Sequence, residues 1–374
     1  ITLLVVCLLP ISRGQALDND VTPNAKSAIL IEANSRQILY DKNAEEKLYP
    51  ASTTKIMTMI LMFEALRNKK ISFDDEITTS KYAASMGGSQ VYLEVGESLS
   101  LKDMFKSIAI ASANDASVAV AEHIAGSINK FVEMMNDKAK KLGLKNTHFK
   151  NATGLHDPDH YTCAHDLAIM AAYLIEIGGE DLFAVTSLYD SYIREDTKQS
   201  FWLVNTNKLL KLYNGVDGLK TGYTKEAGYC LVTTAQRDGQ RIIGVLMKET
   251  APKTRNEEMC SLLDYGFNNY KQVTIFKKDT LIEQHLVDKM DNLTIDVKCK
   301  KDIVYTKAKS ADAKVSTKVN YKENFLPVKQ GDVIGTLDVI VDGKTIATYD
   351  VYSDTNASKS TYLSKTIKTL KYLF

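Results

Sequence analysis

The sequence predicts a mixed α/β domain, in which antiparallel strands are flanked by helices, followed by a smaller all-β module. Up to about residue 270, short β-favouring runs alternate with stretches whose apolar residues have helical spacing. From residue 293 to residue 352, only the alternating pattern of strands appears. A chain of 374 residues also exceeds what one compact core usually holds, which favours a large and a small domain.

The first residues have the features of a secretion signal. Residues 1–11 form an apolar run that is too short for a membrane span, and small residues around Gly14 and Ala16 follow at a plausible cleavage point. A buried strand is the alternative interpretation. We therefore predict a signal peptide over residues 1–16 and an exported protein.

The next segments predict a hairpin and then a helix. Residues 27–32 and 37–40 are apolar and β-favouring, and Ala-Asn-Ser-Arg separates them. After Pro50, residues 52–66 carry apolar side chains at helical spacing, and serine is a good first residue of a helix. A helix should therefore begin at or next to Ser52.

Two further regions place polar residues at the ends of elements. The helical stretch 101–124 is interrupted at residues 111–115, where turn-forming residues cluster. Residues 229–235 and 241–247 predict two strands joined by an Asp-Gly turn, and residues 252–270 predict a closing helix.

The C-terminal part predicts strands over residues 293–297, 333–341 and 344–352, preceded by a polar, lysine-rich connection at 270–278. Residues 361–374 place Leu, Ile and Phe on one helical face and lysines on the other, which favours a membrane-anchoring amphipathic helix over an ordinary terminal helix. The predicted divisions are a catalytic domain at 17–272, a β-rich domain at 273–355 and an anchoring helix at 356–374.

Composition excludes several classes of protein. Hydrophobic content of 44% and charged content of 25% are ordinary for a folded globular chain. A net charge of +1 gives no electrostatic footprint for nucleic acid. The cysteines have no CxxC spacing, so no disulfide framework is implied, and the pairing of those at 163, 230, 260 and 299 stays open.

Three short motifs carry the chemistry. Ser52-Thr-Thr-Lys55 puts a hydroxyl and an amine three residues apart, on one face of a helix, so that the amine can act as the base for the hydroxyl. Ser112-Ala-Asn114 falls at the helix interruption, and Lys220-Thr-Gly222 borders a strand. A second Ser-x-x-Lys match begins at Ser127, next to a helix end, and is interpreted as a surface coincidence.

In this order and context the motifs resemble those of the penicillin-recognising serine enzymes. The surrounding text (YPASTTKIMT, MGGSQVYLEVGE, IASANDASVAVAEHIAG, NGVDGLKTGYT) looks like the low-molecular-mass D-alanyl-D-alanine carboxypeptidases, over residues 24–355. The resemblance implies a serine β-lactamase/transpeptidase-like α/β (α+β) fold with a small all-β domain behind it. It also implies removal of the terminal D-alanine from peptidoglycan stem peptides, inhibition by β-lactams, and neither cofactor nor metal.

The resemblance also assigns roles to the motif residues. Ser52 would attack the penultimate D-alanine carbonyl and Lys55 would take its proton. Ser112 and Lys220 would relay a proton to the leaving amine, and Asn114 would bind the substrate amide. Lys220 and Thr221 would bind the terminal carboxylate, and Gly222 would let the substrate approach closely. The N–H groups of Ser52 and Tyr223 would form the oxyanion hole.

One segment departs from the family pattern. Carboxypeptidases of this group often carry an arginine before the lysine motif, but this chain has Asn205-Thr-Asn-Lys208 there. Carboxylate recognition should then depend more on Lys220 and Thr221, with Lys208 as a candidate helper.

Several rival functions stay under consideration. A serine β-lactamase would need a carboxylate for fast deacylation, and no Glu-x-x-x-Asn segment of that kind lies between Asn114 and Lys220. A Ser-His-Asp hydrolase lacks a G-x-S-x-G elbow. A zinc site at His156, His160, Cys163 and His165 ranks below incidental loop histidines, and a catalytically silent wall scaffold is disfavoured by the intact motifs. The cellular programme, the oligomeric state and the preference between carboxypeptidase and endopeptidase activity remain open.

Overall fold

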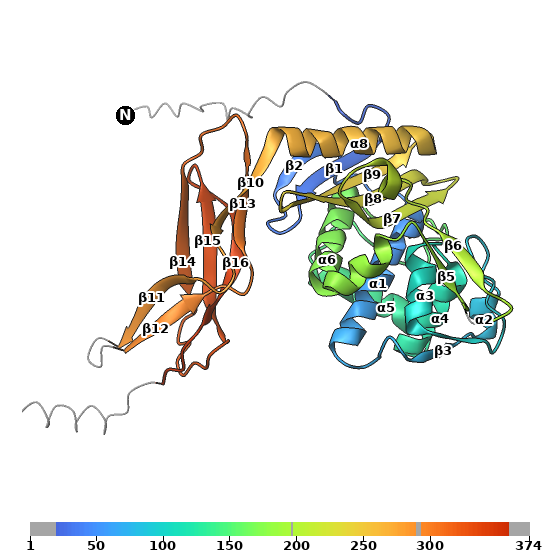
Figure 1. The fold of residues 1–374 in the computed structure, drawn as a ribbon, viewed down its shortest axis with the longest axis horizontal. Coiled ribbons are helices and arrows are strands. Elements are labelled where there is room, and N and C mark those ends of the chain that lie inside the picture. Colours follow the sequence, from blue (N-terminus) through green and yellow to red (C-terminus); the bar gives the residue numbers. More distant parts are fainter. Residues whose placement is uncertain (1–19, 196, 289–292, 359–374) are drawn as a thin grey trace, which may run out of the picture.

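The computed structural model describes residues 20–195, 197–288 and 293–358, and these form two parts that follow one another along the chain (Figure 1). The predicted signal peptide at 1–16 and residues 359–374 of the predicted anchoring helix lie outside the described residues. The larger part ends with helix α8 (Pro252–Asn269), and the smaller part begins with strand β10 (Tyr270–Phe276). The predicted mixed domain followed by an all-β module is confirmed.

The larger part is built on an antiparallel sheet with the strand order β2-β1-β9-β8-β7. The predicted hairpins are confirmed, because β1 pairs with β2 and β8 pairs with β9 in antiparallel register. The order also brings the two ends of the domain together, since β1 pairs with β9. The strands are β1 (Ser27–Glu32), β2 (Ile38–Lys42), β7 (Val216–Thr224), β8 (Gly228–Arg237) and β9 (Gln240–Glu249).

Helices cover both faces of this sheet (Figure 1). Alternate residues of a strand point to opposite faces, so Ile29 and Ile31 join the core under the main helical layer, whereas Ala28 and Leu30 pack in the core under α8. The helices of the main layer are η1 (Ala51–Thr54), α1 (Lys55–Arg67), α2 (Lys81–Ala84), α3 (Leu101–Ala109), α4 (Asn114–Ala125), α5 (Ile128–Lys141) and α6 (Ala164–Thr186). The short helix α7 (Leu209–Leu212) contributes Leu209 to the core under α8.

Ser52 lies just before the buried helix α1. Ser52 lies in the short 3-10 helix η1, and α1 continues from Lys55, as the periodicity predicts. Two small two-stranded sheets border the helical layer, β3 (Glu76–Thr78) with β4 (Ser98–Ser100) and β5 (Asp190–Ile193) with β6 (Phe201–Val204). The predicted interruption after residue 110 is confirmed, because α3 ends at Ala109 and α4 begins at Asn114.

The smaller part is a β module with its own apolar core, which includes Ile295, Val297, Leu337 and Val351. Its main sheet has the order β11-β12-β16-β15-β14, and β10 pairs with β13 beside it. The polar segment 270–278, expected as a connection, is mostly strand β10, because β13 supplies a partner for its backbone. The other strands are β11 (Leu281–Asp288), β12 (Leu293–Lys298), β13 (Ile303–Ala308), β14 (Val315–Tyr321), β15 (Val333–Val341) and β16 (Lys344–Ser353).

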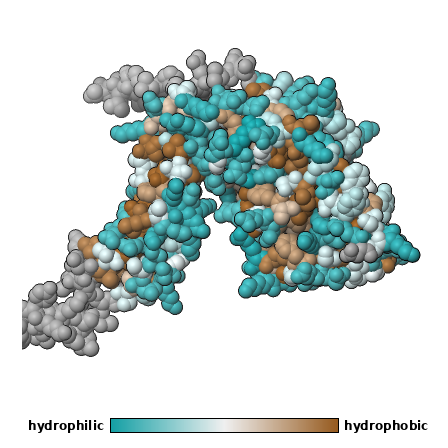
Figure 2. Space-filling model, viewed as in Figure 1, coloured by the Kyte–Doolittle hydropathy of each residue, from teal (hydrophilic) through white to brown (hydrophobic). Residues whose placement is uncertain are grey.

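An ion cluster joins the two parts on one side. The Glu176 carboxylate lies 3.5 Å from Arg36 in the larger part and 3.5 Å from Lys301 in the β module. In the space-filling view the parts meet at one end and diverge towards the other, with hydrophilic residues prominent on both walls of the open notch (Figure 2). Within the described residues, no helix combines the length and apolar character that a membrane span needs.

Candidate active site

The first motif residues meet at the junction of η1 and α1. The Nζ atom of Lys55 lies 3.1 Å from the Oγ atom of Ser52, as the helical spacing predicts. Lys55 is fully buried, whereas Ser52 is partly exposed and lines a cleft. A hydroxyl is therefore presented to solvent with an amine directly behind it.

Two carbonyl oxygens fix the position of the Lys55 amine. Nζ lies 2.6 Å from Oδ1 of Asn114 and 2.8 Å from the main-chain oxygen of Thr153. A neutral amine has two N–H groups and one lone pair, so donation to these two acceptors leaves the lone pair for the hydroxyl of Ser52. The arrangement therefore suits a base that accepts the proton of Ser52.

Electrostatics favour the neutral amine. Burial, with a smaller contribution from the positive charge of Lys220, holds the pKa of Lys55 well below its usual value, and the carboxylate of Asp115 opposes this shift only in part. An amine in this state can accept a proton at neutral pH.

The loop that supplies the Thr153 oxygen packs tightly against η1. Gly154 has φ +86°, and a Cβ atom placed on it would lie 1.8 Å from the main-chain oxygen of Ala51. The side-chain oxygen of Asn151 accepts hydrogen bonds from the N–H groups of Thr153 and Gly154 at 3.1 and 2.7 Å. Glycine is therefore required for the loop to lie this close to Ser52.

We expect Gly154→Ala to lower the free energy of unfolding by about 2 kcal/mol or more, because it adds a main-chain clash to an unfavourable φ. Gly239→Ala is the matched control, since Gly239 has φ +81° but no atom within 4 Å of the place that a Cβ atom would take. That control should cost only about 1 kcal/mol. Thermal unfolding of both variants measures the difference, and equal losses would contradict the close packing argued for Gly154.

The second motif lies at the start of α4. Ser112 is almost fully buried and has φ +63°, in the turn between α3 and α4. Asn114 is engaged at both ends of its carboxamide, because Oδ1 accepts from Lys55 and Nδ2 donates to the oxygen of Gly87 at 2.7 Å. The neighbouring Asp115 accepts hydrogen bonds from the N–H groups of Val91 and Leu93. The segment that contains MGGSQVYL is thereby anchored beside the motif.

The third motif lies on β7, at the edge of the sheet. Lys220 is buried, and its Nζ atom donates to the oxygen of Thr221 at 3.1 Å. Burial, followed by the positive charge of Arg255, lowers the pKa of Lys220 to about 7. A Cβ atom on Gly222 would lie 3.0 Å from the main-chain nitrogen of Ser52, so β7 and the Ser52 segment are in close contact. Tyr223 follows, 56% exposed and stacked on Tyr229 with ring centroids 4.3 Å apart.

These elements surround one cleft of about 500 Å³. The predicted site residues that line it are Ser52, Ser112, Thr221, Gly222 and Tyr223. Lys55 and Asn114 lie behind it and are joined to Ser52 by the contacts above. Lys220 is close enough for its charge to act on Lys55. The three motifs, which are far apart in the chain, therefore meet at one place.

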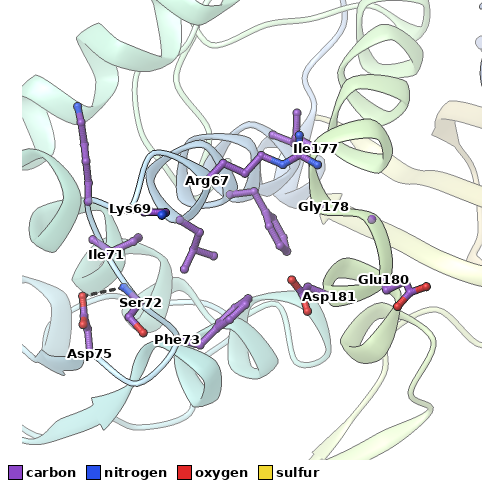
Figure 3. Close-up of a pocket in the computed structure, with 14 residues that line it drawn as sticks. Arg67, Lys69, Ile71, Ser72, Phe73, Asp75, Ile177, Gly178, Glu180 and Asp181 are labelled. Carbon is purple, nitrogen blue, oxygen red and sulfur yellow. Dashed lines mark hydrogen bonds between the residues drawn. The ribbon is translucent and has the colours of Figure 1, made fainter. Parts of the chain in front are cut away.

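A larger hollow of about 770 Å³ lies at the end of α1, next to the kink of α6 at Gly179 (Figure 3). Arg67 and Lys69 lie on one side of it and Glu180 and Asp181 on the other. None of its lining residues belongs to the three motifs.

The cleft also contains residues that sequence reasoning missed. Arg255, on α8, lines it and is 6% exposed. Thr206 lines it as well, and its hydroxyl accepts from the Thr221 hydroxyl at 2.7 Å. No motif marks either residue. The one signal that could have indicated Arg255 was a basic residue in the first turn of a helix that follows a strand of the same sheet.

In the segment 205–208, which departs from the family pattern, the two asparagines hold the main chain in place. Asn205 donates to the oxygen of Leu188 at 2.9 Å, and Asn207 donates to the oxygen of Gly218 at 3.0 Å. Lys208 lines the cleft, but its Nζ atom donates to the oxygen of Asn205 at 3.0 Å and lies over the ring of Tyr189. The guanidinium in this cleft therefore comes from α8 and not from this segment.

The histidine-rich loop has other partners. His160 is buried and lies 2.9 Å from the hydroxyl of Thr54, and burial lowers its pKa to about 4. His165 lies beside Glu45 and Asp166, and Cys163 is a free thiol. Within residues 20–195, 197–288 and 293–358, no group of three or more of these side chain types has the geometry to hold a metal ion.

A family model described as "D-alanyl-D-alanine carboxypeptidase" matches residues 15–251, which is more than half of the chain. The chain belongs to this family. A second model, described as "Penicillin-binding protein 5, C-terminal domain", matches residues 270–359 of this carboxypeptidase. The catalytic motifs and the β module therefore both have counterparts in the family.

Curated relatives of this carboxypeptidase extend over nearly the whole chain. The D-alanyl-D-alanine carboxypeptidase DacF of Bacillus subtilis is 44% identical over 354 residues, which cover 93% of this chain and 90% of the relative. DacC of Escherichia coli is 34% identical over 332 residues, which cover 86% and 82%.

Solved structures agree with this assignment. Penicillin-binding protein 5 of Haemophilus influenzae superposes with a TM-score of 0.74 at 31% identity, covering 90% of this chain and 98% of that one. Penicillin-binding protein D2 of Listeria monocytogenes, in its ampicillin-bound form, gives a TM-score of 0.59 at 30% identity and covers 65% and 98%. The predicted family, fold class and main function of this D-alanyl-D-alanine carboxypeptidase are confirmed, whereas the β-lactamase and silent-scaffold alternatives gain no support.

Proposed function

We propose that this carboxypeptidase removes the terminal D-alanine of peptidoglycan stem peptides through an acyl-enzyme on Ser52, with Lys55 as the base. The observation that carries the proposal is the contact set of Lys55, in which two carbonyl oxygens can accept from both N–H groups of a neutral amine, so that its lone pair is left for the Ser52 hydroxyl 3.1 Å away.

In the first half of the reaction, Oγ of Ser52 bonds to the penultimate D-alanine carbonyl carbon as its proton passes to Lys55. The carbon–nitrogen bond to the last D-alanine then breaks, and Ser112 with Lys220 relays a proton to the departing amine. The oxyanion is held by the N–H groups of Ser52 and Tyr223. In the second half, water attacks the ester, returns the proton to Ser52 and releases the shortened peptide.

The terminal carboxylate is bound at the far end of the cleft. We assign it to the hydroxyl of Thr221, the ammonium of Lys220 and the guanidinium of Arg255, because all three lie on or beside the same stretch of β7. A guanidinium can bind a carboxylate through two parallel hydrogen bonds. Arg255 would therefore replace the arginine that the 205–208 segment lacks.

Binding of the substrate amide by Asn114 requires an exchange of partners. Its Oδ1 atom already accepts from Lys55, and its Nδ2 atom already donates to Gly87. The Gly87 contact is the one that substrate can replace without moving the base. Gly222, which has no side chain, leaves the edge of β7 open for the peptide to add as a strand.

The cellular setting is also a proposal. Export through residues 1–16, a catalytic domain at 17–272, a β domain at 273–355 and peripheral membrane contact through residues 356–374 fit an exported enzyme at the outer face of the cytoplasmic membrane or in the cell wall. β-Lactams would acylate Ser52 as they do other serine enzymes of this motif class.

Release of D-alanine from an N-acylated peptide ending in D-Ala-D-Ala, compared with hydrolysis of benzylpenicillin by the same preparation, tests this function. We expect steady turnover of the peptide and slow hydrolysis of the acyl-enzyme formed with penicillin. The reason is that the sequence between Asn114 and Lys220 has no Glu-x-x-x-Asn segment to supply a carboxylate for deacylation. Faster turnover of penicillin than of the peptide would overturn the assignment in favour of a β-lactamase.

A further inference from the structure

A buried carboxyl group lies close to the cleft without any role in the chemistry above. Glu249, the last residue of β9, is 2% exposed. Neither of its side-chain oxygens has a hydrogen-bond partner within the described residues. A carboxylate in this position would lack the donors that ionised groups need when they are buried, so the geometry calls for a proton on Glu249.

A protonated Glu249 can donate a hydrogen bond to the carboxylate of Glu258, on α8. Its carboxylate accepts from the main-chain and side-chain nitrogens of Asn24 at 2.9 and 2.6 Å and from the N–H group of Ala25 at 3.1 Å. Burial acts to raise the pKa of Glu258, but the hydrogen bond with Glu249 and these donors together hold it below its usual value. Burial, together with the adjacent Glu258, raises the pKa of Glu249 to about 8. The two carboxyl groups therefore hold one proton between them at neutral pH.

Arg255 lies three residues before Glu258 and so projects from the same side of α8. Its guanidinium is buried and donates to the side-chain oxygen of Asn256 at 2.9 and 3.2 Å, and within the described residues it has no carboxylate partner. Glu249 is close enough for its ionised form to stabilise the positive charge of Arg255. The protonation state of Glu249 thus decides whether Arg255 has a counter-ion inside the protein.

We propose that Glu249 is a positioning residue which, by keeping its proton against Glu258, leaves Arg255 free to bind the terminal carboxylate of the substrate. The inference rests on the carboxylate-binding role of Arg255 in the proposed function. When Glu249 ionises, it becomes an internal competitor for the same guanidinium. Affinity for the carboxylate then falls.

The other titratable groups near Glu249 are not available to pair with its ionised form. Lys42, on β2, is the further cation that acts on Glu249, and its Nζ atom is already paired with Asp20 at 2.8 Å. Tyr229 lies opposite Glu249 in the register of β8 and β9. Cys230, the next residue of β8, is a buried thiol whose pKa burial raises to about 11. Glu258 is held by the Asn24 segment. Arg255 is therefore the cation whose pairing changes when Glu249 loses its proton.

The test measures KM for an N-acylated D-Ala-D-Ala peptide between neutral pH and about pH 10 in the full chain and in Glu249→Gln. The wild type should lose affinity by about tenfold relative to Glu249→Gln as pH rises through about 8, because loss of one charge interaction of this kind is worth about a factor of ten. Lys220 titrates in both proteins, so the difference between them isolates Glu249. The inhibition constant of the peptide's C-terminal amide, which has no carboxylate, should be the same in both.

Glu258→Gln gives an opposite and independent expectation. Without the Glu258 charge, burial alone raises the pKa of Glu249, so Glu249 should ionise at a lower pH than in the wild type and KM should begin to rise at that lower pH. The double variant Glu249→Gln/Glu258→Gln should restore it, which a simple loss of folding would not do. The C=O stretching band of a protonated carboxylic acid should be present in the wild type at neutral pH and absent in Glu249→Gln.

Superimposed pH profiles of KM for the wild type and Glu249→Gln would overturn the inference. Arg255→Ala separates this result from failure of the proposed function. A raised KM for the peptide in Arg255→Ala, with an unchanged inhibition constant for the amide, leaves the role of Arg255 intact. An unchanged KM in Arg255→Ala would overturn that role and the inference with it.

Discussion

We expect Ser52→Ala to gain no mass on exposure to benzylpenicillin, while the wild type gains the mass of one inhibitor molecule. The hydroxyl of Ser52 is the atom that would form the covalent bond, because the buried amine of Lys55 lies within hydrogen-bond distance of it. Release of D-alanine should fall by a factor of about 10⁴ or more, because removal of a nucleophile leaves only binding and the oxyanion hole. Intact-mass spectrometry and a D-alanine assay measure the two effects.

The chain offers a matched control for this variant. Ser127 belongs to the second Ser-x-x-Lys match, and in the structure its hydroxyl accepts from the N–H group of Lys130 at the start of α5. Ser127→Ala should lose about 1 kcal/mol of stability as a helix cap and should keep the full adduct. An adduct of unchanged yield in Ser52→Ala would remove the nucleophile assignment.

The second large effect is expected for Lys55. Lys55→Arg keeps a cationic side chain but cannot accept a proton, so the rate of acylation by benzylpenicillin should fall by about 10³. In the wild type, the lowered pKa of Lys55 favours the neutral amine, and the rate should fall as the pH is lowered and the amine becomes protonated. Time-resolved mass spectrometry over a series of pH values measures both.

Lys130→Arg is the control, since Lys130 has the same spacing from Ser127 and is an exposed residue of α5. Its acylation rate should equal that of the wild type at every pH. A Lys55→Arg variant that acylates at the wild-type rate would show that another group takes the proton of Ser52.

Local spacing predicted the parts of the fold and site that depend on neighbouring residues. The contact of Ser52 with Lys55, the interruption before Asn114 and the Asp-Gly hairpin all follow from residues within a few positions of each other. The meeting of Lys55 with Asn114, 59 residues away, was expected only because the motifs resemble a known family.

What sequence could not predict depends on tertiary packing. Arg255 and Glu249 look like solvent-facing polar residues, and only the pairing of β8 with β9 under α8 buries them together. The position of the Thr153 main-chain oxygen cannot be predicted from residue type, yet this oxygen accepts a hydrogen bond from the Lys55 amine. Strand β10 was mistaken for a connection because its partner β13 begins more than twenty residues later.

Helix α8 begins in the cleft, where Pro252, Arg255 and Asn256 line the wall, and it ends at Asn269, where the β module starts. Eighteen helical residues make a rod of about 27 Å. The main-chain oxygen of Asn269 accepts a hydrogen bond from the main-chain N–H group of Lys309 at 2.8 Å, so the C-terminal end of α8 is bonded to the β module. Because α8 is continuous between these two ends, a single helix connects the start of the β module to the wall of the cleft.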